Sequence, residues 1–333
     1  MNRIAIIGAG AWGTALATVA RRAAREVTLW AREPEVVDAI NDSRENALFL
    51  PGVPLDPGIV ATGDLAEAID GAESILLVTP AQHTRAVAAE LAPHLPESVP
   101  AVICAKGIEQ GTGKLMSEVL AELSPGRALA VLSGPTFAGE VARGLPTAVT
   151  LAAEAEGLGR RLVETLGGRH FRPYWSPDVV GAQIGGAVKN VLAIACGIVE
   201  GRGLGDNARA ALITRGLAEI VRLGTAKGAR TETLFGLSGL GDLTLTCTAE
   251  QSRNYSLGLA VGRGEALADI MGARRSVAEG VHTAASVTAL ADTLGVEMPI
   301  AAAVNAILHE GAVIDEAVEG LLTRPFRSES VAP

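Results

Sequence analysis

The sequence has few aromatic residues and few cysteines. Aromatics make up 3% of the 333 residues, whereas hydrophobic residues of all kinds make up 48%, so the core has to be built from Ala, Val, Leu and Ile. The three cysteines, Cys104, Cys196 and Cys247, form no C-x-x-C pair and have no histidine spaced nearby as a metal partner. No structural zinc or other metal site is therefore expected, and a reducing compartment is favoured.

The sequence also lacks an excess of positive charge and a long apolar run. Its formal net charge is −9, which argues against a nucleic-acid partner because phosphate backbones are bound by clustered cations. No uninterrupted apolar stretch reaches the roughly 18 residues of a membrane span, and the closest, 184–199, contains Lys189 and Asn190. The apolar run at 4–7 ends at Gly8, too soon for a signal peptide. We expect a cytoplasmic protein without integral membrane association.

Two patterns of hydrophobicity divide the chain. Short runs rich in apolar and β-branched residues, typical of buried parallel strands, occur at 3–7, 26–30, 74–78, 101–104 and 128–132. Helical patterns separate them at 14–24, 85–91 and 115–123. After about Asp178 long helical segments take over, at 182–200, 208–227, 256–263 and 283–294. The patterns predict an α/β domain with a parallel-rich sheet at 1–181 and an all-α C-terminal domain at 182–333.

A glycine-rich loop follows the first expected strand. Gly8-Ala9-Gly10-Ala11-Trp12-Gly13 is a G-x-G-x-x-G directly before the first helix. Its glycines suit a tight turn, close approach of the backbone to a pyrophosphate, and packing of helix against strand. The helix N-terminus adds free N–H groups and partial positive charge. The pattern alone is a weak signal, but at the first β–α junction it predicts a Rossmann domain that binds a nicotinamide dinucleotide.

The end of the second expected strand bears on the choice of dinucleotide. NAD sites usually carry an acidic residue there, which binds the ribose 2′-hydroxyl. This strand ends at Trp30-Ala31-Arg32, and Glu33 comes slightly late. The planar guanidinium of Arg32 suits the 2′-phosphate of NADP, although a solvated surface arginine is the alternative. NADP(H) is thus at least as well supported as NAD(H).

Lys189 is the predicted proton donor and acceptor. Reduction of a ketone by hydride needs a proton donor at the carbonyl oxygen, and the reverse reaction needs a base. None of the five histidines has an obviously constrained setting, whereas Lys189 lies within the apolar stretch 184–193. Burial and a nearby cation would lower its pKa from near 10.4 toward neutrality. The alternative is a structural lysine paired with a carboxylate.

Further candidates follow the expected strands and the glycine-rich segments. Lys106 ends the fourth strand, on the ligand side of the sheet, where it could bind substrate and cofactor and depress the pKa of Lys189. Gly134 and Thr136 follow the fifth strand and offer N–H groups and a hydroxyl, with an ordinary turn as the alternative. Asp242 lies in the segment 235–243, which we expect to be too glycine-rich for a helix.

Ser252, Arg253 and Asn254 place a hydroxyl, a guanidinium and an amide side by side. Such a group makes a good anion clamp in an otherwise acidic protein, because charge-assisted hydrogen bonds are the strong ones. A helix start capped by Ser252 is the competing interpretation, and the two are compatible.

These residues resemble those of the bacterial NAD(P)-dependent glycerol-3-phosphate dehydrogenases. The resemblance spans Ile4 to about Ala291 and rests on segments in matching order and spacing, at 8–17, 106–109, 134–140, 187–190, 236–242, 252–254 and 277–281. Hydroxyacid dehydrogenases and ketopantoate reductases are similar in plan, but by resemblance they carry an Asn several residues after the lysine, whereas Asn190 is adjacent. A dinucleotide-sensing regulator and a glycine-loop methyltransferase are the alternatives from other classes.

The resemblance implies interconversion of dihydroxyacetone phosphate and sn-glycerol 3-phosphate with NAD(P)H, supplying glycerophospholipid synthesis, with Lys189 as proton acceptor or donor. The implied substrate site consists of Lys106, Gly134, Thr136, Lys189, Asp242, Ser252, Arg253 and Asn254. The implied dinucleotide contacts are Gly8, Gly10, Ala11, Trp12, Gly13, Arg32, Lys106, Ala138, Arg253, Val277 and Glu279. Many members have Ser where this chain has Ala11, which removes one phosphate hydrogen bond. A homodimer is one expected assembly.

Overall fold

The computed structural model describes residues 1–273 and 278–325, and the chain divides into two compact units. Unit 1 contains residues 1–105 and 116–179, and unit 2 contains residues 106–115 and the described residues from 180 onward. The segment Lys106–Leu115, which the sequence analysis placed within the first domain, is thus part of the helical unit. Lys106 belongs to the same unit as Lys189 for this reason.

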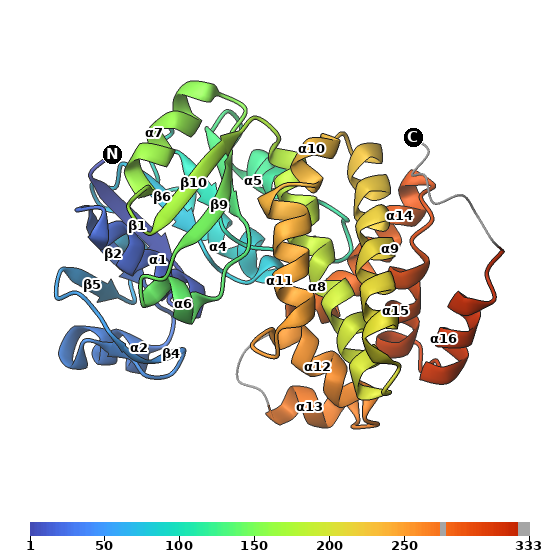
Figure 1. The fold of residues 1–333 in the computed structure, drawn as a ribbon. Coiled ribbons are helices and arrows are strands. Elements are labelled where there is room, and N and C mark those ends of the chain that lie inside the picture. The colour runs from blue at the N-terminus through green and yellow to red at the C-terminus, as the bar shows by residue number, and fades with distance from the viewer. Residues whose placement is uncertain (274–277, 326–333) are drawn as a thin grey trace. The chain divides into compact units, whose positions relative to one another are not determined.

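Unit 1 is built on one eight-stranded sheet of order β10-β9-β8-β7-β6-β1-β2-β5 (Figure 1). Its strands are β1 (Arg3–Ile7), β2 (Glu26–Trp30), β5 (Ile59–Thr62), β6 (Ser74–Leu77), β7 (Ala101–Ile103), β8 (Leu129–Ser133), β9 (Thr147–Ala152) and β10 (Phe171–Ser176). All neighbouring strands are parallel except β8 and β9, which are antiparallel. The predicted parallel-rich sheet is confirmed. The strand pattern of β10 escaped prediction because Arg172 and Pro173 interrupt it.

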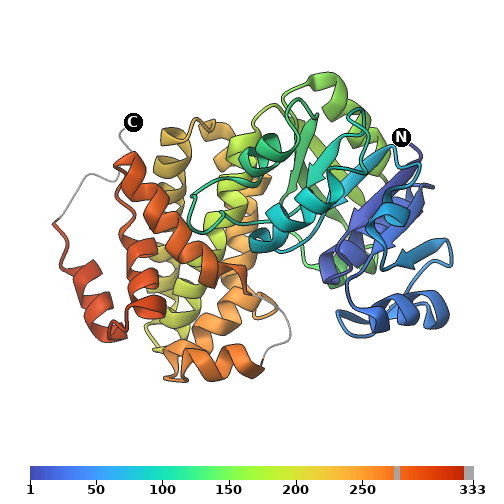
Figure 2. The same ribbon diagram turned by 180° about the vertical axis from the view of Figure 1, so that it is seen from behind.

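Helices cover both faces of this sheet. They are α1 (Ala11–Arg22), α2 (Pro34–Asp38), α3 (Leu65–Ile69), α4 (Thr84–Leu91), α5 (Met116–Leu123), α6 (Ala138–Ala142) and α7 (Glu156–Leu166). Figure 1 shows α1 and α6 on one face, and Figure 2 shows the opposite face with α4 and α5. A separate hairpin of β3 (Glu45–Asn46) and β4 (Leu50–Pro54) lies outside the main sheet. Strand β1 is central, since Ile4, Ala5, Ile6 and Ile7 are completely buried.

Unit 2 contains no strand among its described residues. Its helices are α8 (Val179–Gly201), α9 (Gly205–Ala226), α10 (Thr231–Leu234), α11 (Asp242–Thr248), α12 (Arg253–Gly262), α13 (Leu267–Ala273), α14 (Glu279–Leu294), α15 (Pro299–His309) and α16 (Ile314–Leu322). The predicted all-α C-terminal region is confirmed. Two glycines let α8 and α12 pack backbone against backbone, because a Cβ on Gly197 would lie 2.1 Å from the Tyr255 carbonyl oxygen and one on Gly258 would lie 2.0 Å from that of Ile194.

Helix α8 forms the centre of unit 2. It is the one helix among the described residues that is long and apolar enough to cross a membrane. Residues 181–199 are nevertheless buried without exception inside the protein. We conclude that α8 is the core helix of its unit, and that Lys189 and Asn190 lie in this apolar core.

The segment before α11 corrects one prediction. Residues 235–243 were expected to be too glycine-rich for a helix, but Leu237–Gly241 forms a π-helical turn that leads directly into α11. Gly239 makes the turn possible, since a Cβ there would lie 1.8 Å from the Leu234 carbonyl oxygen. The glycines therefore permit tight helical packing, and π-helical turns are frequent at functional sites.

A buried carboxyl group on α9 links it to the start of α15. Glu219 is 1% exposed, and its two oxygens accept hydrogen bonds from the backbone N–H groups of Ile300 (2.7 Å) and Ala301 (3.2 Å). These bonds satisfy donors that the first turn of a helix leaves free. Burial raises the pKa of Glu219 to about 7, against the opposing effect of the two hydrogen bonds.

We expect the free energy of unfolding to fall as the pH rises from 5 to 8 because of Glu219. Its pKa in the folded protein, about 7, exceeds the ordinary value of 4.5, so its contribution is complete below pH 4.5 and is lost as the pH rises through 7. This difference in pKa corresponds to at most about 3 kcal/mol of the free energy of unfolding. Urea unfolding at several pH values should show a flatter profile for Glu219→Gln, and identical profiles for variant and wild type would contradict this prediction.

Candidate active site

The glycine loop of unit 1 has the geometry of an anion-binding turn. Gly8 has φ +118°, and a Cβ there would lie 3.0 Å from the Val78 carbonyl carbon, while one on Gly13 would lie 1.8 Å from the Gly8 carbonyl oxygen. Gly10 differs, because a Cβ there would meet no atom within 4 Å. Two glycines are thus required for packing, and the third leaves the backbone accessible to a ligand.

The start of α1 fits the negatively charged pyrophosphate of a dinucleotide. Gly10 is its N-cap and supplies no side-chain acceptor, and the first turn contains no acidic residue. The N–H groups of Ala11, Trp12 and Gly13 therefore remain available to an anion. The Trp12 Nε1 atom is buried and has no hydrogen-bond partner.

Two other predicted dinucleotide contacts lie in unit 1. Arg32 follows β2, its side chain is 76% exposed, and its guanidinium lies 3.3 Å from the Glu33 carboxylate. Such an arginine can approach a ligand with little rearrangement. Ala138 is the first residue of α6, which packs against α1.

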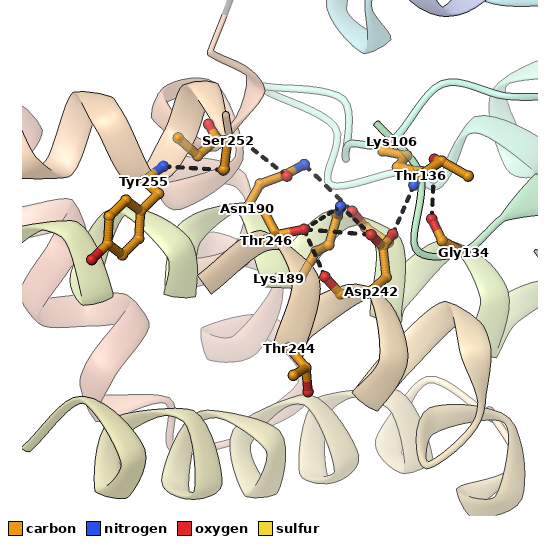
Figure 3. Close-up of polar contacts among 12 residues, drawn as sticks. Lys106, Gly134, Thr136, Lys189, Asn190, Asp242, Thr244, Thr246, Ser252 and Tyr255 are labelled. Atoms are coloured by element: carbon orange, nitrogen blue, oxygen red, sulfur yellow. Dashed lines mark hydrogen bonds and ion pairs between the residues drawn. The ribbon is translucent and has the colours of Figure 1, made fainter. Parts of the chain in front are cut away.

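The centre of unit 2 holds two lysines on one carboxylate (Figure 3). The Lys189 Nζ atom lies 2.5 Å from Asp242 Oδ1, and the Lys106 Nζ atom lies 2.7 Å from Asp242 Oδ2. Thr246 Oγ1, one turn further along α11, accepts a hydrogen bond from Lys189 Nζ at 2.8 Å and donates to the Asp242 carbonyl oxygen at 2.6 Å. Asp242 is completely buried, so its charge requires both cations.

This environment lowers the pKa of Lys189 to about 8 from 10.5. Burial is the largest cause, the positive charge of Lys106 acts in the same direction, and Asp242 opposes both. The lowered pKa of Lys189, and burial and Lys106 as two of its causes, agree with the sequence-based expectation. The alternative of a lysine paired with a carboxylate is also correct, since Asp242 is that partner. A lysine with a pKa near 8 can both donate and accept a proton close to neutral pH.

The predicted anion clamp is partly used by the fold itself. Ser252 is the N-cap of α12 and its Oγ accepts a hydrogen bond from the Tyr255 N–H at 3.2 Å, so the helix-start interpretation is confirmed. The Asn254 side chain donates to Asn190 Oδ1 and accepts from the Gly280 N–H, each at 2.9 Å. Both Ser252 and Asn254 are buried, whereas Arg253 is exposed. The side chain best placed to meet an external anion here is therefore Arg253.

The remaining predicted residues have simpler surroundings. In unit 1 Thr136 Oγ1 donates to the Gly134 carbonyl oxygen at 3.2 Å, and a Cβ on Gly134 would lie 2.9 Å from Val149 Cα. In unit 2 burial lowers the pKa of the Arg253 guanidinium, and the carboxylate of Glu279, the first residue of α14, opposes this effect. Val277 lies outside the described residues.

Comparison with known proteins decides the family. A sequence model described as the NAD-dependent glycerol-3-phosphate dehydrogenase N-terminus matches residues 3–158, and one described as its C-terminus matches residues 178–319. The chain is 62% identical to a glycerol-3-phosphate dehydrogenase [NAD(P)+] of Parvibaculum lavamentivorans over 99% of this chain and 98% of the relative. It belongs to the glycerol-3-phosphate dehydrogenase family.

Other glycerol-3-phosphate dehydrogenases agree over the full length. The protein of Rhodospirillum rubrum is 64% identical over 99% of this chain and 94% of its own length. The crystal structure of glycerol-3-phosphate dehydrogenase from Coxiella burnetii matches with a TM-score of 0.93 and 42% identity, covering 97% of this chain and 99% of that one. Family membership decides against the ketopantoate reductases, the hydroxyacid dehydrogenases and the alternatives from other classes.

Membership in the glycerol-3-phosphate dehydrogenase family also makes NAD(P) the coenzyme class. The glycine loop and the acid-free start of α1 suit that group. The sequence analysis missed Thr246 and treated Asn190 only as a motif neighbour of Lys189. Thr246 follows Asp242 by four residues on α11, and this helical spacing was the available signal.

Proposed function

We propose that this chain catalyses the NAD(P)H-dependent interconversion of dihydroxyacetone phosphate and sn-glycerol 3-phosphate, and so supplies glycerophospholipid synthesis. The observation that supports this best is the buried Lys189–Asp242–Lys106 cluster within a member of this family. A regulator that only binds a dinucleotide would have no need of two lysines on a buried carboxylate, which are costly to bury.

Lys189 is the proposed general acid and base. Bound NAD(P)H supplies the hydride that reduces C2 of dihydroxyacetone phosphate. The Lys189 ammonium donates a proton to the C2 oxygen, and in the reverse direction the neutral amine removes it from the hydroxyl. Asp242 and Thr246 orient the Lys189 Nζ atom through their hydrogen bonds. Burial is the main cause of the low pKa of Lys189, and Lys106 lowers it further. Lys106 also carries positive charge that suits an anionic substrate.

Arg253 is the proposed anchor of the substrate phosphate. Arg253 lies in the first turn of α12, where the N-terminal N–H groups also favour an anion. Ser252 can still donate its hydroxyl hydrogen, because its oxygen acts as the acceptor for Tyr255. Asn254 acts mainly by holding Asn190 and the start of α14. Gly134 and Thr136, which lie in unit 1, remain predicted substrate contacts.

In unit 1 the dinucleotide is proposed to contact the glycine loop, Arg32 and Ala138. Lys106, Arg253 and Glu279, which lie in unit 2, remain predicted contacts. Ala11 supplies its backbone N–H but no hydroxyl. Val277 and a homodimeric state remain predictions.

A substrate screen tests the proposed function. The purified chain should oxidise NADPH or NADH in the presence of dihydroxyacetone phosphate, and should turn over ketopantoate or pyruvate at least about a hundredfold more slowly, because those substrates lack a phosphate for Arg253. Parallel absorbance assays with both coenzymes measure this. Faster turnover of ketopantoate, or no turnover of dihydroxyacetone phosphate, would refute the assignment.

Arg32 is expected to favour NADPH. Arg32→Ala should raise the KM for NADPH about tenfold or more, because a charge-assisted hydrogen bond contributes about 1.5–3 kcal/mol, and should change the KM for NADH less than about twofold. Arg160→Ala is a matched control, since Arg160 is also an exposed arginine of unit 1 paired with a glutamate. Equal losses with both coenzymes would show that Arg32 does not recognise the 2′-phosphate.

A further inference from the structure

Asn46, in the hairpin outside the main sheet, contacts the glycine loop directly. It is 1% exposed. Its Nδ2 atom donates to the Ala9 carbonyl oxygen and to Thr14 Oγ1, each at 2.8 Å, and its Oδ1 atom accepts from the Phe49 N–H at 3.1 Å. Both amide hydrogens and the amide oxygen are thus engaged. Because a backbone N–H must face the oxygen, these partners determine the orientation of the amide.

The contact with Ala9 determines how the middle of the loop presents its backbone. The Ala9 carbonyl and the Gly10 N–H belong to one peptide group, which is trans because no described peptide bond is cis, so the two point in opposite directions. Thr14 Oγ1 also approaches the Ala9 oxygen, at 3.4 Å. With the carbonyl held on the buried side by Asn46, the Gly10 N–H faces the opposite side.

Gly10 permits this peptide to rotate. Gly10 has no side chain, and a Cβ added to it would meet no atom within 4 Å, so packing does not hold the backbone there. A rotated Ala9 carbonyl would present a partial negative charge where a phosphate has to bind. The hydrogen bond from Asn46 prevents this rotation.

We propose that Asn46 is a positioning residue for dinucleotide binding, which holds the Ala9–Gly10 peptide with its N–H available to the pyrophosphate. The inference rests on the proposed use of the loop for NAD(P)H. Asn46 does not touch the reacting atoms, so its loss acts on coenzyme affinity and leaves the chemical step intact.

The chain offers a matched control in Asn41. Its side chain donates to the Ala61 carbonyl oxygen at 2.8 Å and accepts from the Ala61 N–H at 2.9 Å. Asn41 is therefore also an amide that bridges backbone groups in unit 1, but its partner is β5, not the glycine loop. Leucine has nearly the shape of asparagine and no polar atoms, so Asn46→Leu and Asn41→Leu form a comparable pair.

Asn46→Leu should weaken NADPH and ADP-ribose binding at least tenfold, while kcat at saturating NADPH stays within about threefold of wild type. Binding of AMP, which has no pyrophosphate, should change less than twofold. Asn41→Leu should reduce the melting temperature without weakening the binding of any of these ligands. Fluorescence titration, inhibition constants and thermal unfolding measure the three effects.

A second variant covers the case in which Asn46→Leu does not fold. Thr14→Val removes a hydrogen-bond partner of both Asn46 and the Ala9 oxygen, and should weaken NADPH binding about threefold or more. Thr14→Ser keeps the hydroxyl and should bind NADPH as tightly as wild type. Unchanged NADPH affinity in a folded Asn46→Leu protein, or in Thr14→Val, overturns the inference, as does an equal loss in Asn41→Leu. If the wild-type chain binds neither NADPH nor NADH, the proposed function fails as well.

Discussion

Replacing Lys189 by methionine is expected to lower kcat for dihydroxyacetone phosphate reduction by at least a hundredfold, with NADPH affinity within about twofold of wild type. General acid help contributes typically 10²–10⁴-fold, and Met fills a similar volume without a transferable proton. Steady-state kinetics and NADPH titration measure both values. Lys227→Met, a lysine at the end of α9, is the control. Normal turnover in Lys189→Met would remove this residue from the mechanism.

The pH dependence of the wild type follows from the same lysine. Its pKa of about 8 means that the ammonium form, which reduction needs, is lost as the pH rises through 8. Dihydroxyacetone phosphate reduction should therefore decline above pH 8, and sn-glycerol 3-phosphate oxidation should increase through the same range. Profiles of kcat/KM in both directions check this. Parallel profiles for the two directions would contradict the assignment of both roles to Lys189.

Asp242→Asn is expected to have the second largest effect. The change keeps the shape of the side chain but leaves the buried ammonium of Lys189 and the partly buried one of Lys106 without their counterion. Breaking a buried ion pair costs about 3–5 kcal/mol of stability. Because Asp242 raises the pKa of Lys189, its removal should shift the pH profile of the residual activity to lower pH. We expect kcat to fall about a hundredfold or more.

Two control variants distinguish this effect of Asp242→Asn on Lys189 from a simple loss of folding. Asp315→Asn, at an exposed aspartate paired with Arg202, should leave activity and its pH profile unchanged. Thr246→Val removes a hydrogen bond to Lys189 but no charge, so its profile should keep the wild-type position. An Asp242→Asn protein whose residual activity has the wild-type pH profile would show that Asp242 does not tune Lys189.

Much of unit 1 was predictable because its signals are local. The strand 3–7 and the glycine loop are contiguous, and the buried strand, the turn and the start of α1 each follow from neighbouring residues. Strand β10 was not predictable in this way, since the interruption at Pro173 hides its pattern. The prediction for segment 235–243 was wrong for a related reason, because glycine permits both a loop and a tightly packed helical turn.

By itself the sequence determined that a lysine lies in an apolar helix and that a glycine loop follows the first strand, since both features depend on residue order alone. Only the tertiary structure decided what meets that lysine. Asp242 is 53 residues from Lys189 and 136 from Lys106 in the chain, and helical periodicity predicts which face is buried but not which partner it meets. Asn46 and the Ala9 carbonyl, 37 residues apart, were paired by the fold for the same reason, because a buried polar group must find a partner and only packing determines which one is near.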